Sequence, residues 1–263
     1  MKVISIISSY RKNGNTEHLS SLIEEELKSI AKFQHVVLEI ERIFLGQAEL
    51  KMCLGCRTCF DRGEEFCPLK DELLSIREKL NEADGIVLAS PVYVEDVNGI
   101  MKNWIDRMAF NCHRPAFADK TAVVVSTSGI GASNHALKTM KTALMTWGFY
   151  VNNQQKFSTG ALMKREQIYD RYNHKIKTIA INLFNAIKNK KVLKPSFYSL
   201  VMFKVQQKYW QKKSNERYTI DYIYWNEKGW LSPECTYYSI IKTNWLKVKM
   251  ARLFGEIIAT FFI

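Results

Sequence analysis

The stretch VISIISSYRKNGNTEHLSSLIEEEL, residues 3–27, predicts how the chain begins. A short apolar run is followed by a loop of hydroxyl, amide and basic side chains, and leucine and isoleucine then recur at helical spacing. We therefore expect a buried strand over 2–8 and a helix over 15–33, which Asn15 or Thr16 can cap. A polar loop between a strand and a helix N-terminus is suited to hold an anion, because the first helical turn offers unpaired N–H groups.

The alternation of strand and helix continues along the chain. We expect further strands over 35–41, 85–90, 121–126 and 148–157, and helices over 70–82, 98–110, 132–146 and 164–188. This alternation favours a parallel α/β sheet. Loops rich in hydroxyl groups or glycine follow three of the strands, at 8–16, 90–99 and 126–133. Ligands of open parallel sheets bind outside the carboxyl ends of the strands, so these three loops predict a ligand site.

The loop at 8–16 has the composition of a phosphate site but neither of the common nucleotide fingerprints. No Gly-Lys-Ser/Thr follows Gly14, and the only G-x-G, at 129–131, lacks the third glycine of the dinucleotide pattern. Five hydroxyl or amide side chains with one arginine suit the single phosphate group of a monoester. An ordinary polar turn between strand and helix is the alternative interpretation.

Two of these segments resemble a known family. The loop SSYRKNGNT resembles the Gly-Ser-x-Arg-x-x-Gly-Asn-Thr phosphate loop of the NADPH-dependent FMN reductase family, with Ser8 in place of the glycine. ADGIVLASPVYVEDVNGIMKNWIDR, residues 83–107, is similar to the second signature of that family, and TSGIG at 127–131 matches its third flavin-contacting loop in position. The resemblance covers about residues 1–185 and implies a flavodoxin-like fold, a doubly wound sheet of five parallel strands.

The resemblance also implies which residues contact the flavin. The FMN phosphate would be held by Ser9, Arg11, Asn13, Gly14, Asn15 and Thr16. The isoalloxazine would be lined by Pro91, Val92 and Tyr93 and closed on its other edge by Thr127, Ser128 and Gly129. A core aromatic at a strand end is the alternative for Tyr93, although its place after Ser-Pro in a loop argues against it. No side chain is expected to be catalytic, because the flavin carries the chemistry.

Four of the six cysteines lie within fifteen residues, in the pattern C-x2-C-x2-C-x7-C-P. They are Cys53, Cys56, Cys59 and Cys67. Three cysteines at this spacing can surround one face of an iron–sulfur cube, and a fourth followed by proline is similar to the bacterial ferredoxin run. The pattern resembles the iron–sulfur flavoproteins, a branch of the same family that carries a [4Fe–4S] cluster beside FMN. Zinc bound by four thiolates and free thiols in a loop both stay open as alternatives.

The positive charge of the chain is concentrated in its C-terminal part. Residues 1–150 hold 18 Lys and Arg against 19 Asp and Glu, whereas residues 151–263 hold 20 against 7. We predict an FMN-binding domain over 1–190 and a basic, aromatic-rich, mostly helical extension over 191–263. The extension is expected to pack on the core or on a second subunit, and peripheral contact with an anionic membrane is the alternative. No nucleic-acid recognition motif accompanies the charge.

The resemblance implies an FMN-dependent NAD(P)H oxidoreductase. Hydride would pass from the nicotinamide to flavin N5, and then to an acceptor such as a quinone, a nitro or azo compound, or another flavin. One alternative is an electron carrier with FMN and an iron–sulfur cluster that exchanges single electrons with protein partners. Another is a regulatory or scaffold protein that has kept the fold.

Further expectations concern assembly and location. A homodimer or homotetramer is expected from the resemblance alone. The lack of a signal peptide and of any apolar run of about 18 residues predicts a cytoplasmic protein. Lys102, Asp106 and Arg107, which share one predicted helix, are expected to form a structural ion-pair set or a dimer contact.

Overall fold

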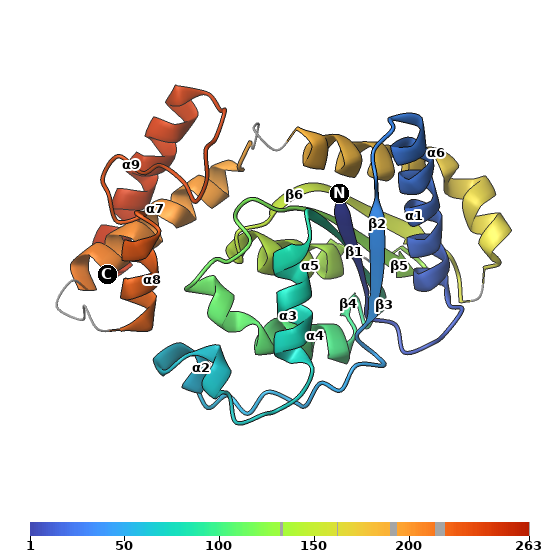
Figure 1. Cartoon of the computed structure of the whole chain (residues 1–263), viewed down its shortest axis with the longest axis horizontal. Helices are drawn as coiled ribbons and strands as arrows, with labels where there is room; N and C mark the ends of the chain where they lie inside the picture. The colour runs from blue at the N-terminus through green and yellow to red at the C-terminus, as the bar shows by residue number, and fades with distance from the viewer. Residues whose placement is uncertain (132–133, 162, 190–193, 214–218, 263) are drawn as a thin grey trace.

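The central element of the fold is a sheet of parallel strands in the order β2-β1-β3-β5-β6 (Figure 1). The computed structural model describes all residues except 132–133, 162, 190–193, 214–218 and 263. The strands are β1 (Lys2–Ile7), β2 (Glu39–Phe44), β3 (Gly85–Tyr93), β5 (Thr121–Ser128) and β6 (Tyr150–Ser158). The short β4 (Asp96–Val97) pairs antiparallel with the end of β3. This order confirms the flavodoxin-like doubly wound sheet of five parallel strands.

Helices cover both faces of the sheet. One face carries α1 (Asn15–Phe33) and α6 (Arg165–Lys188), and the other carries α3 (Leu73–Glu82), α4 (Gly99–Arg107) and α5 (Asn134–Thr146). Alternate residues of each strand face opposite layers, so that Val87 packs with α1 and α6 whereas Ile86 packs on the other side. Burial on both faces explains why the sequences of the central strands β1, β3 and β5 are rich in continuous apolar residues.

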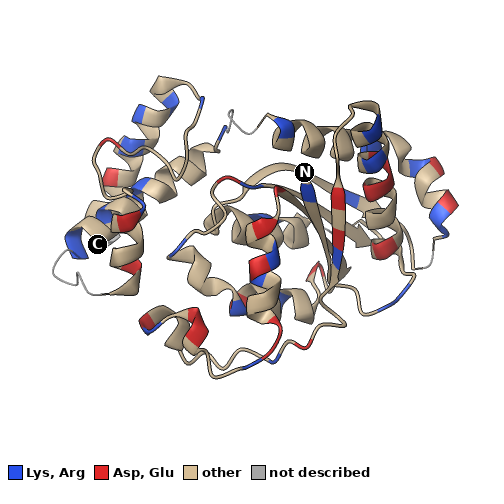
Figure 2. Cartoon of the chain, in the orientation of Figure 1, with Lys and Arg blue, Asp and Glu red and all other residues tan. Residues whose placement is uncertain are grey.

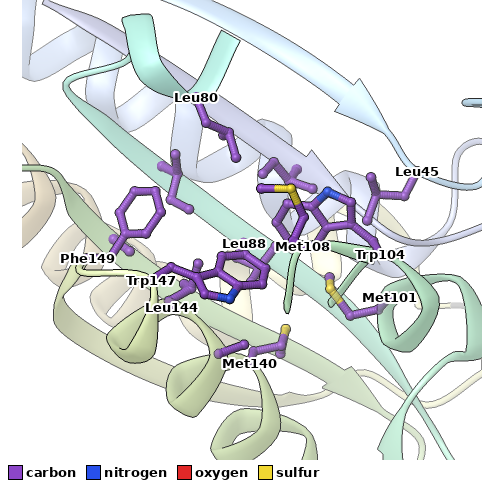
Figure 3. Packing of buried hydrophobic residues seen from close by; sticks show 14 of the residues in the cluster. Leu45, Leu80, Leu88, Met101, Trp104, Met108, Met140, Leu144, Trp147 and Phe149 are labelled. Atoms are coloured by element: carbon purple, nitrogen blue, oxygen red, sulfur yellow. The ribbon is translucent and has the colours of Figure 1, made fainter. Parts of the chain in front are cut away.

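The larger core layer lies beneath α3, α4 and α5 (Figure 3). Trp104 of α4 and Trp147, just after α5, meet edge to face with ring centroids 5.2 Å apart. Met101, Met108 and Met140 fill the space around the two rings. This packing fixes α4 against the sheet, which matters below because α4 contacts both candidate cofactor sites.

Two expectations about element boundaries are wrong. The second strand was expected at 35–41 but runs from Glu39 to Phe44, because His35 adopts a left-handed conformation (φ 54°) and the chain turns after α1. Gly14, and not Asn15 or Thr16, occupies the N-cap of α1. The remaining helices begin and end within about three residues of expectation, and residues 132–133 of the fourth expected helix lie outside the described part of the chain.

The third strand is also longer than expected. It was expected to end at Ser90, with Pro91, Val92 and Tyr93 in a loop, but all three belong to β3. The last β1 partner of β3 is Ala89, so beyond that point one edge of β3 has no parallel neighbour. Proline is tolerated at such an edge because it has no N–H to donate. The three residues still lie at the carboxyl end of the strand.

The C-terminal region is helical, as predicted, and has its own apolar cluster. It contains α7 (Phe197–Lys212), α8 (Ile220–Glu227) and α9 (Trp245–Phe262), which Figure 1 shows as a group beside the sheet layers. The cluster includes Leu200, Phe203, Trp210, Trp225, Trp230 and Ala251. Basic residues outnumber acidic ones on α7 and α9 (Figure 2). The predicted boundary between 190 and 191 falls within 190–193, outside the described residues.

Candidate functional site

The three loops singled out in the sequence meet at the carboxyl ends of three neighbouring strands. β1, β3 and β5 are neighbours, and Pro91 lies opposite Thr127 in the register of β3 and β5. The Ser8 N–H donates to the carbonyl of Ala89 at 3.0 Å, and the hydroxyls of Ser8 and Ser90 are also 3.0 Å apart. The loop after β1 is thereby attached to the end of β3.

The loop after β1 is tightly turned and opens to solvent. The Arg11 N–H donates to Ser9 Oγ at 3.2 Å, and Asn13 adopts a left-handed conformation with φ 56°. Arg11 and Asn13 are exposed, whereas Gly14 is buried at the N-cap of α1. The first turn of α1 therefore begins directly behind an exposed basic loop, which is the arrangement of an anion site.

The side chains of Asn15 and Thr16 form hydrogen bonds with residues at the ends of β5 and β6. The Asn15 amide donates to Thr159 Oγ1 at 2.9 Å and to the Gly160 carbonyl at 3.0 Å. The Thr16 and Thr127 hydroxyls lie 2.7 Å apart. Both side chains are buried and attach α1 to the ends of β5 and β6. A phosphate at this loop could accept hydrogen bonds from the backbone N–H groups of these two residues, which belong to the first turn of the helix.

Glu17 is a residue of the candidate site that the sequence reasoning missed. Its carboxylate accepts a hydrogen bond from the Asn13 N–H at 2.7 Å. An acidic residue in the first turn stabilises a helix N-terminus. Here it also places a negative charge where the loop would receive an anion, so it occupies a donor that a phosphate could use.

Exposed side chains surround the other two strand ends. Tyr93 is 43% exposed, which rules out the alternative that it is a core aromatic. Val94 and Glu95 form the turn to β4 with φ of 49° and 67°, and Val94 is fully exposed. After β5, the Gly131 N–H donates to Ser128 Oγ at 3.0 Å and shapes the third loop.

The four clustered cysteines line one pocket of about 90 Å³. It lies between α2 (Thr58–Asp61), the short 3-10 helices η1 (Glu64–Phe66) and η2 (Ala109–Cys112), α3 and α4. Gly55 and Arg57 both have φ of 63°, and these two turns bend the segment around the cavity. The apolar part of the lining comes from Leu54, Phe60, Leu69, Leu73 and Phe110. Among the described residues, no three His, Cys, Asp or Glu converge on one metal-ion position.

The thiols of this pocket differ in environment. Cys53 and Cys56 are exposed, and Cys59 and Cys67 are half-buried. A hydrogen bond with the Thr58 hydroxyl at 3.3 Å lowers the pKa of Cys56. Burial raises the pKa of Cys59. Since the thiolate is the form that binds metal, the lowered pKa makes Cys56 the better candidate ligand of these two thiols.

α4 holds the cysteine segment through Asn103 and Arg107. The Asn103 side chain accepts from the Cys53 N–H at 3.0 Å and donates to the Lys51 carbonyl at 3.1 Å. Arg107 donates to the same carbonyl at 2.7 Å and pairs with Asp71 through two bonds of 2.6 and 3.1 Å. The second Arg107 nitrogen also lies 3.9 Å from Cys67 Sγ.

The pairing of Arg107 corrects one expectation. Lys102 and Asp106 do form an ion pair of 2.5 Å on their own helix. Arg107, however, points into the protein and pairs with Asp71, with only 2% and 1% of the two side chains exposed. It lies five residues after Lys102, and that spacing turns its side chain toward the cysteine segment and away from the other two.

The opposite end of α4 holds the loop after β1. Asn98 caps the helix by accepting from the Met101 N–H at 3.4 Å, and its amide donates to the Ser8 carbonyl at 2.6 Å. One helix therefore contacts both the predicted phosphate loop and the cysteine pocket. Asn98 at the N-cap, directly before Gly99, is a cap signal that the sequence reasoning overlooked.

Comparison with known proteins finds similar flavoproteins over most of the chain. The family model NADPH-dependent FMN reductase matches residues 1–162. An iron-sulfur flavoprotein of Archaeoglobus fulgidus is 28% identical over 232 residues, which cover 88% of this chain and 100% of the relative. One from Methanocaldococcus jannaschii is 42% identical over 107 residues, 41% of this chain and 51% of the relative. The solved structure of a flavone reductase aligns with a TM-score of 0.57 at 16% identity, over 74% of this chain and 66% of that one, which shows a shared fold.

Proposed function

Because the chain belongs to the NADPH-dependent FMN reductase family, we propose that it is an oxidoreductase with FMN at the ends of β1, β3 and β5 and a [4Fe–4S] cluster on its four clustered cysteines. When bound, FMN would accept hydride from NAD(P)H and pass electrons to a quinone, a nitro or azo compound or a flavin, and the cluster would carry single electrons. The observation that carries the proposal is α4, which is hydrogen-bonded to Ser8 through its N-cap Asn98 and to Cys53 through Asn103.

The residues of the first loop fit a phosphate group. Ser9 and Arg11 supply a hydroxyl and a positive charge, and the first turn of α1 supplies N–H groups. Asn15 and Thr16 keep that turn fixed against β5 and β6. At the other strand ends, Tyr93 offers an exposed ring for contact with the isoalloxazine.

The cysteine pocket fits a cluster better than a single zinc ion. A cube binds each cysteine through a different iron, so its ligands surround a cavity, as these four do, and do not converge on one point. Four thiolates also bring negative charge into a mostly apolar pocket. The buried guanidinium of Arg107, 3.9 Å from Cys67 Sγ, would offset part of that charge.

A second candidate function is a single-electron carrier that uses no nicotinamide. The exposure of Cys53 and Cys56 favours it, because a cluster at these ligands would lie near the surface, where a protein partner can approach. In this case electrons would enter and leave through protein contacts alone.

The expected assembly and membrane contact stay predictions. Most of the apolar side chains on the outer face of α9 are exposed, including Leu246, Leu253, Ile257 and Phe261. Basic Lys247 and Lys249 lie on the same helix. Among the described residues, no helix is long and apolar enough to span a membrane.

The first test is an absorbance spectrum of full-length protein purified without air, with iron and FMN assayed on the same sample. The proposal predicts flavin bands, a broad shoulder near 400 nm and about four irons per chain. Cys56→Ser should lower the iron content. Cys235→Ser is the matched control, because that thiol lies outside the pocket and serine can keep its hydrogen bond to the Tyr237 carbonyl.

The outcomes separate the candidates. Rapid bleaching of the flavin by NADH or NADPH supports the oxidoreductase, whereas a loaded protein that does not react with either supports the carrier. Flavin without iron, or iron that survives Cys56→Ser, removes the cluster from the proposal. A protein that stays colourless in the presence of added FMN contradicts both functions.

A further inference from the structure

The helices of the C-terminal region are attached to the segment that follows α4, beside the cysteine pocket. Three of their side chains bind backbone carbonyls of residues 112–115. These bonds run from Gln206 to Cys112 at 2.7 Å, from Trp225 to His113 at 2.7 Å, and from Tyr224 to Pro115 at 2.8 Å. The attachment is made by specific hydrogen bonds and not by apolar contact alone, so the position of α8 is well defined relative to the pocket.

Arg114 lies at the centre of this attachment. One of its terminal nitrogens pairs with Asp221 of α8. The other donates to the Cys59 carbonyl at 2.6 Å and to the Glu64 carboxylate at 2.9 Å. A single guanidinium therefore connects a C-terminal helix with two points of the cysteine segment, because Cys59 and Glu64 both line the pocket.

The ion pair between Arg114 and Asp221 is buried. Only 7% of the Arg114 side chain and 8% of the Asp221 side chain are exposed. Neutralising Asp221 removes one of the two carboxylates that pair with this buried guanidinium and leaves Glu64 as its remaining ion-pair partner. Arg114 is then no longer fixed from the side of α8, and its hydrogen bond to the Cys59 carbonyl is expected to weaken.

His113 supplies a second contact between the same two parts of the chain. Its Nδ1 lies 2.7 Å from Asp221 Oδ2. Its ring meets the ring of Phe60 edge to face at 4.8 Å and that of Trp210 at 5.8 Å. Since Phe60 follows Cys59 directly, Asp221 is connected to this ligand from two sides.

We propose that the C-terminal helices position Cys59 as a cluster ligand, and that Asp221 is the positioning residue, acting through Arg114. This inference rests on the proposed cluster. Asp221 and Arg114 form no hydrogen bond with the sulfur atoms of the four clustered cysteines. Their expected effect is therefore on the position of the Cys59 backbone. Cys53 is held separately by Asn103 of α4, which predicts that loss of Asp221 affects the Cys59 side of the pocket alone.

The test compares Asp221→Asn with Glu227→Gln in full-length protein loaded with FMN and iron. Both changes remove one negative charge from α8, but Glu227 is exposed. Iron release into an excess of chelator is followed without air. Changes in residues that orient metal ligands typically cost 10–100-fold in metal affinity, so we expect iron to leave Asp221→Asn about tenfold faster than the control. Arg114→Lys, which keeps the charge but not the forked geometry, should behave like Asp221→Asn.

A second readout does not depend on the cluster. After chelator treatment the protein is alkylated, and the rate at which each thiol is modified is followed by mass spectrometry. Cys59 should react several-fold faster in Asp221→Asn than in Glu227→Gln, whereas Cys53 should react at the same rate in both. Equal rates at Cys59, or acceleration at every cysteine together with loss of FMN in both Asp221→Asn and Arg114→Lys, would overturn the inference.

The two readouts also separate this inference from the proposed function. Wild-type protein without iron refutes the proposed cluster and, with it, the role of Cys59 as a ligand. The alkylation pattern then still decides whether Asp221 positions Cys59. Wild-type iron that leaves all variants at one rate keeps the cluster and overturns the positioning role.

Discussion

Neutralising Asp71 would leave the buried guanidinium of Arg107 without its carboxylate. The two side chains are 1% and 2% exposed, and two hydrogen bonds join them. Breaking such a buried pair by removing one partner costs about 3–5 kcal/mol. Asp61 is the matched control, because it pairs with Arg57 at the surface, where 57% and 74% of the side chains are exposed. Exposed pairs of this kind contribute roughly 0–1 kcal/mol.

Thermal unfolding of Asp71→Asn and Asp61→Asn measures the difference. For a chain of this size each kcal/mol shifts Tm by about 2–4 °C, so Asp71→Asn should unfold about 6–20 °C below wild type. Asp61→Asn should stay within about 4 °C of wild type. Equal Tm values for the two variants would refute the reasoning, because they would mean that the Arg107 charge does not need Asp71.

The same pair predicts a pH dependence. Burial disfavours the charged form of Asp71, but hydrogen bonds from Arg107 and from the N–H groups of Lys51 and Leu73 outweigh it and lower its pKa. A carboxyl whose pKa is lower in the folded protein stabilises the fold fully above its unfolded value of about 3.9. That stability is lost as pH falls through the folded pKa. The difference in Tm between wild type and Asp71→Asn should therefore be constant near neutral pH and shrink below about pH 4.

Three further substitutions test the candidate FMN loop and the C-terminal helices. Glu17→Gln removes the charge that occupies the Asn13 N–H, and should tighten FMN binding about two- to fivefold in a fluorescence titration, for a change of about 0.5–1 kcal/mol. Gly46→Ala places a Cβ 2.9 Å from the Ser9 carbonyl, and should weaken FMN binding about tenfold because the loop must shift. Gly255→Ala places a Cβ 2.6 Å from Lys204 Cβ, and should lower the free energy of unfolding by about 1–2 kcal/mol in urea.

Controls for these variants are available in the same chain. Glu25→Gln removes a charge beyond the first turn of α1, where the helix-terminus effect has faded. Gly99→Ala adds a Cβ that meets nothing within 4 Å. Unchanged FMN affinity in Glu17→Gln or in Gly46→Ala would contradict the placement of the phosphate at this loop. A Gly255→Ala variant as stable as Gly99→Ala would show that α7 and α9 separate without cost.

Much of the fold was predictable because its signals are local. The apolar runs of β1 and β5 and the helical spacing in α1 can be read directly in the sequence. The errors occurred where local signals compete. At β3, Ser90 and Pro91 look like the start of a loop, but pairing with β5 continues to Pro91 and antiparallel pairing with β4 extends the strand to Tyr93.

The candidate site likewise combines features that the sequence predicts with features that it does not predict. Adjacent parallel strands bring the loops after β1, β3 and β5 together by topology, and the spacing of the cysteines brings four thiols to one pocket. No local pattern in the sequence indicates which residue pairs with each buried charge. Arg107 meets Asp71 across 36 residues, and Arg114 meets Asp221 across 107.

The sequence by itself determined the alternation of strands and helices and the grouping of the cysteines, because each depends on neighbours along the chain, and it predicted an anion site in the first loop. Only the tertiary structure decided that α4 contacts both sites and that α8 reaches the Cys59 carbonyl through Arg114. The physical reason is that an ion pair or hydrogen bond acts over a few ångströms in space. Which residues come that close is set by how the helices pack on the sheet, and this packing leaves no regular spacing in the sequence.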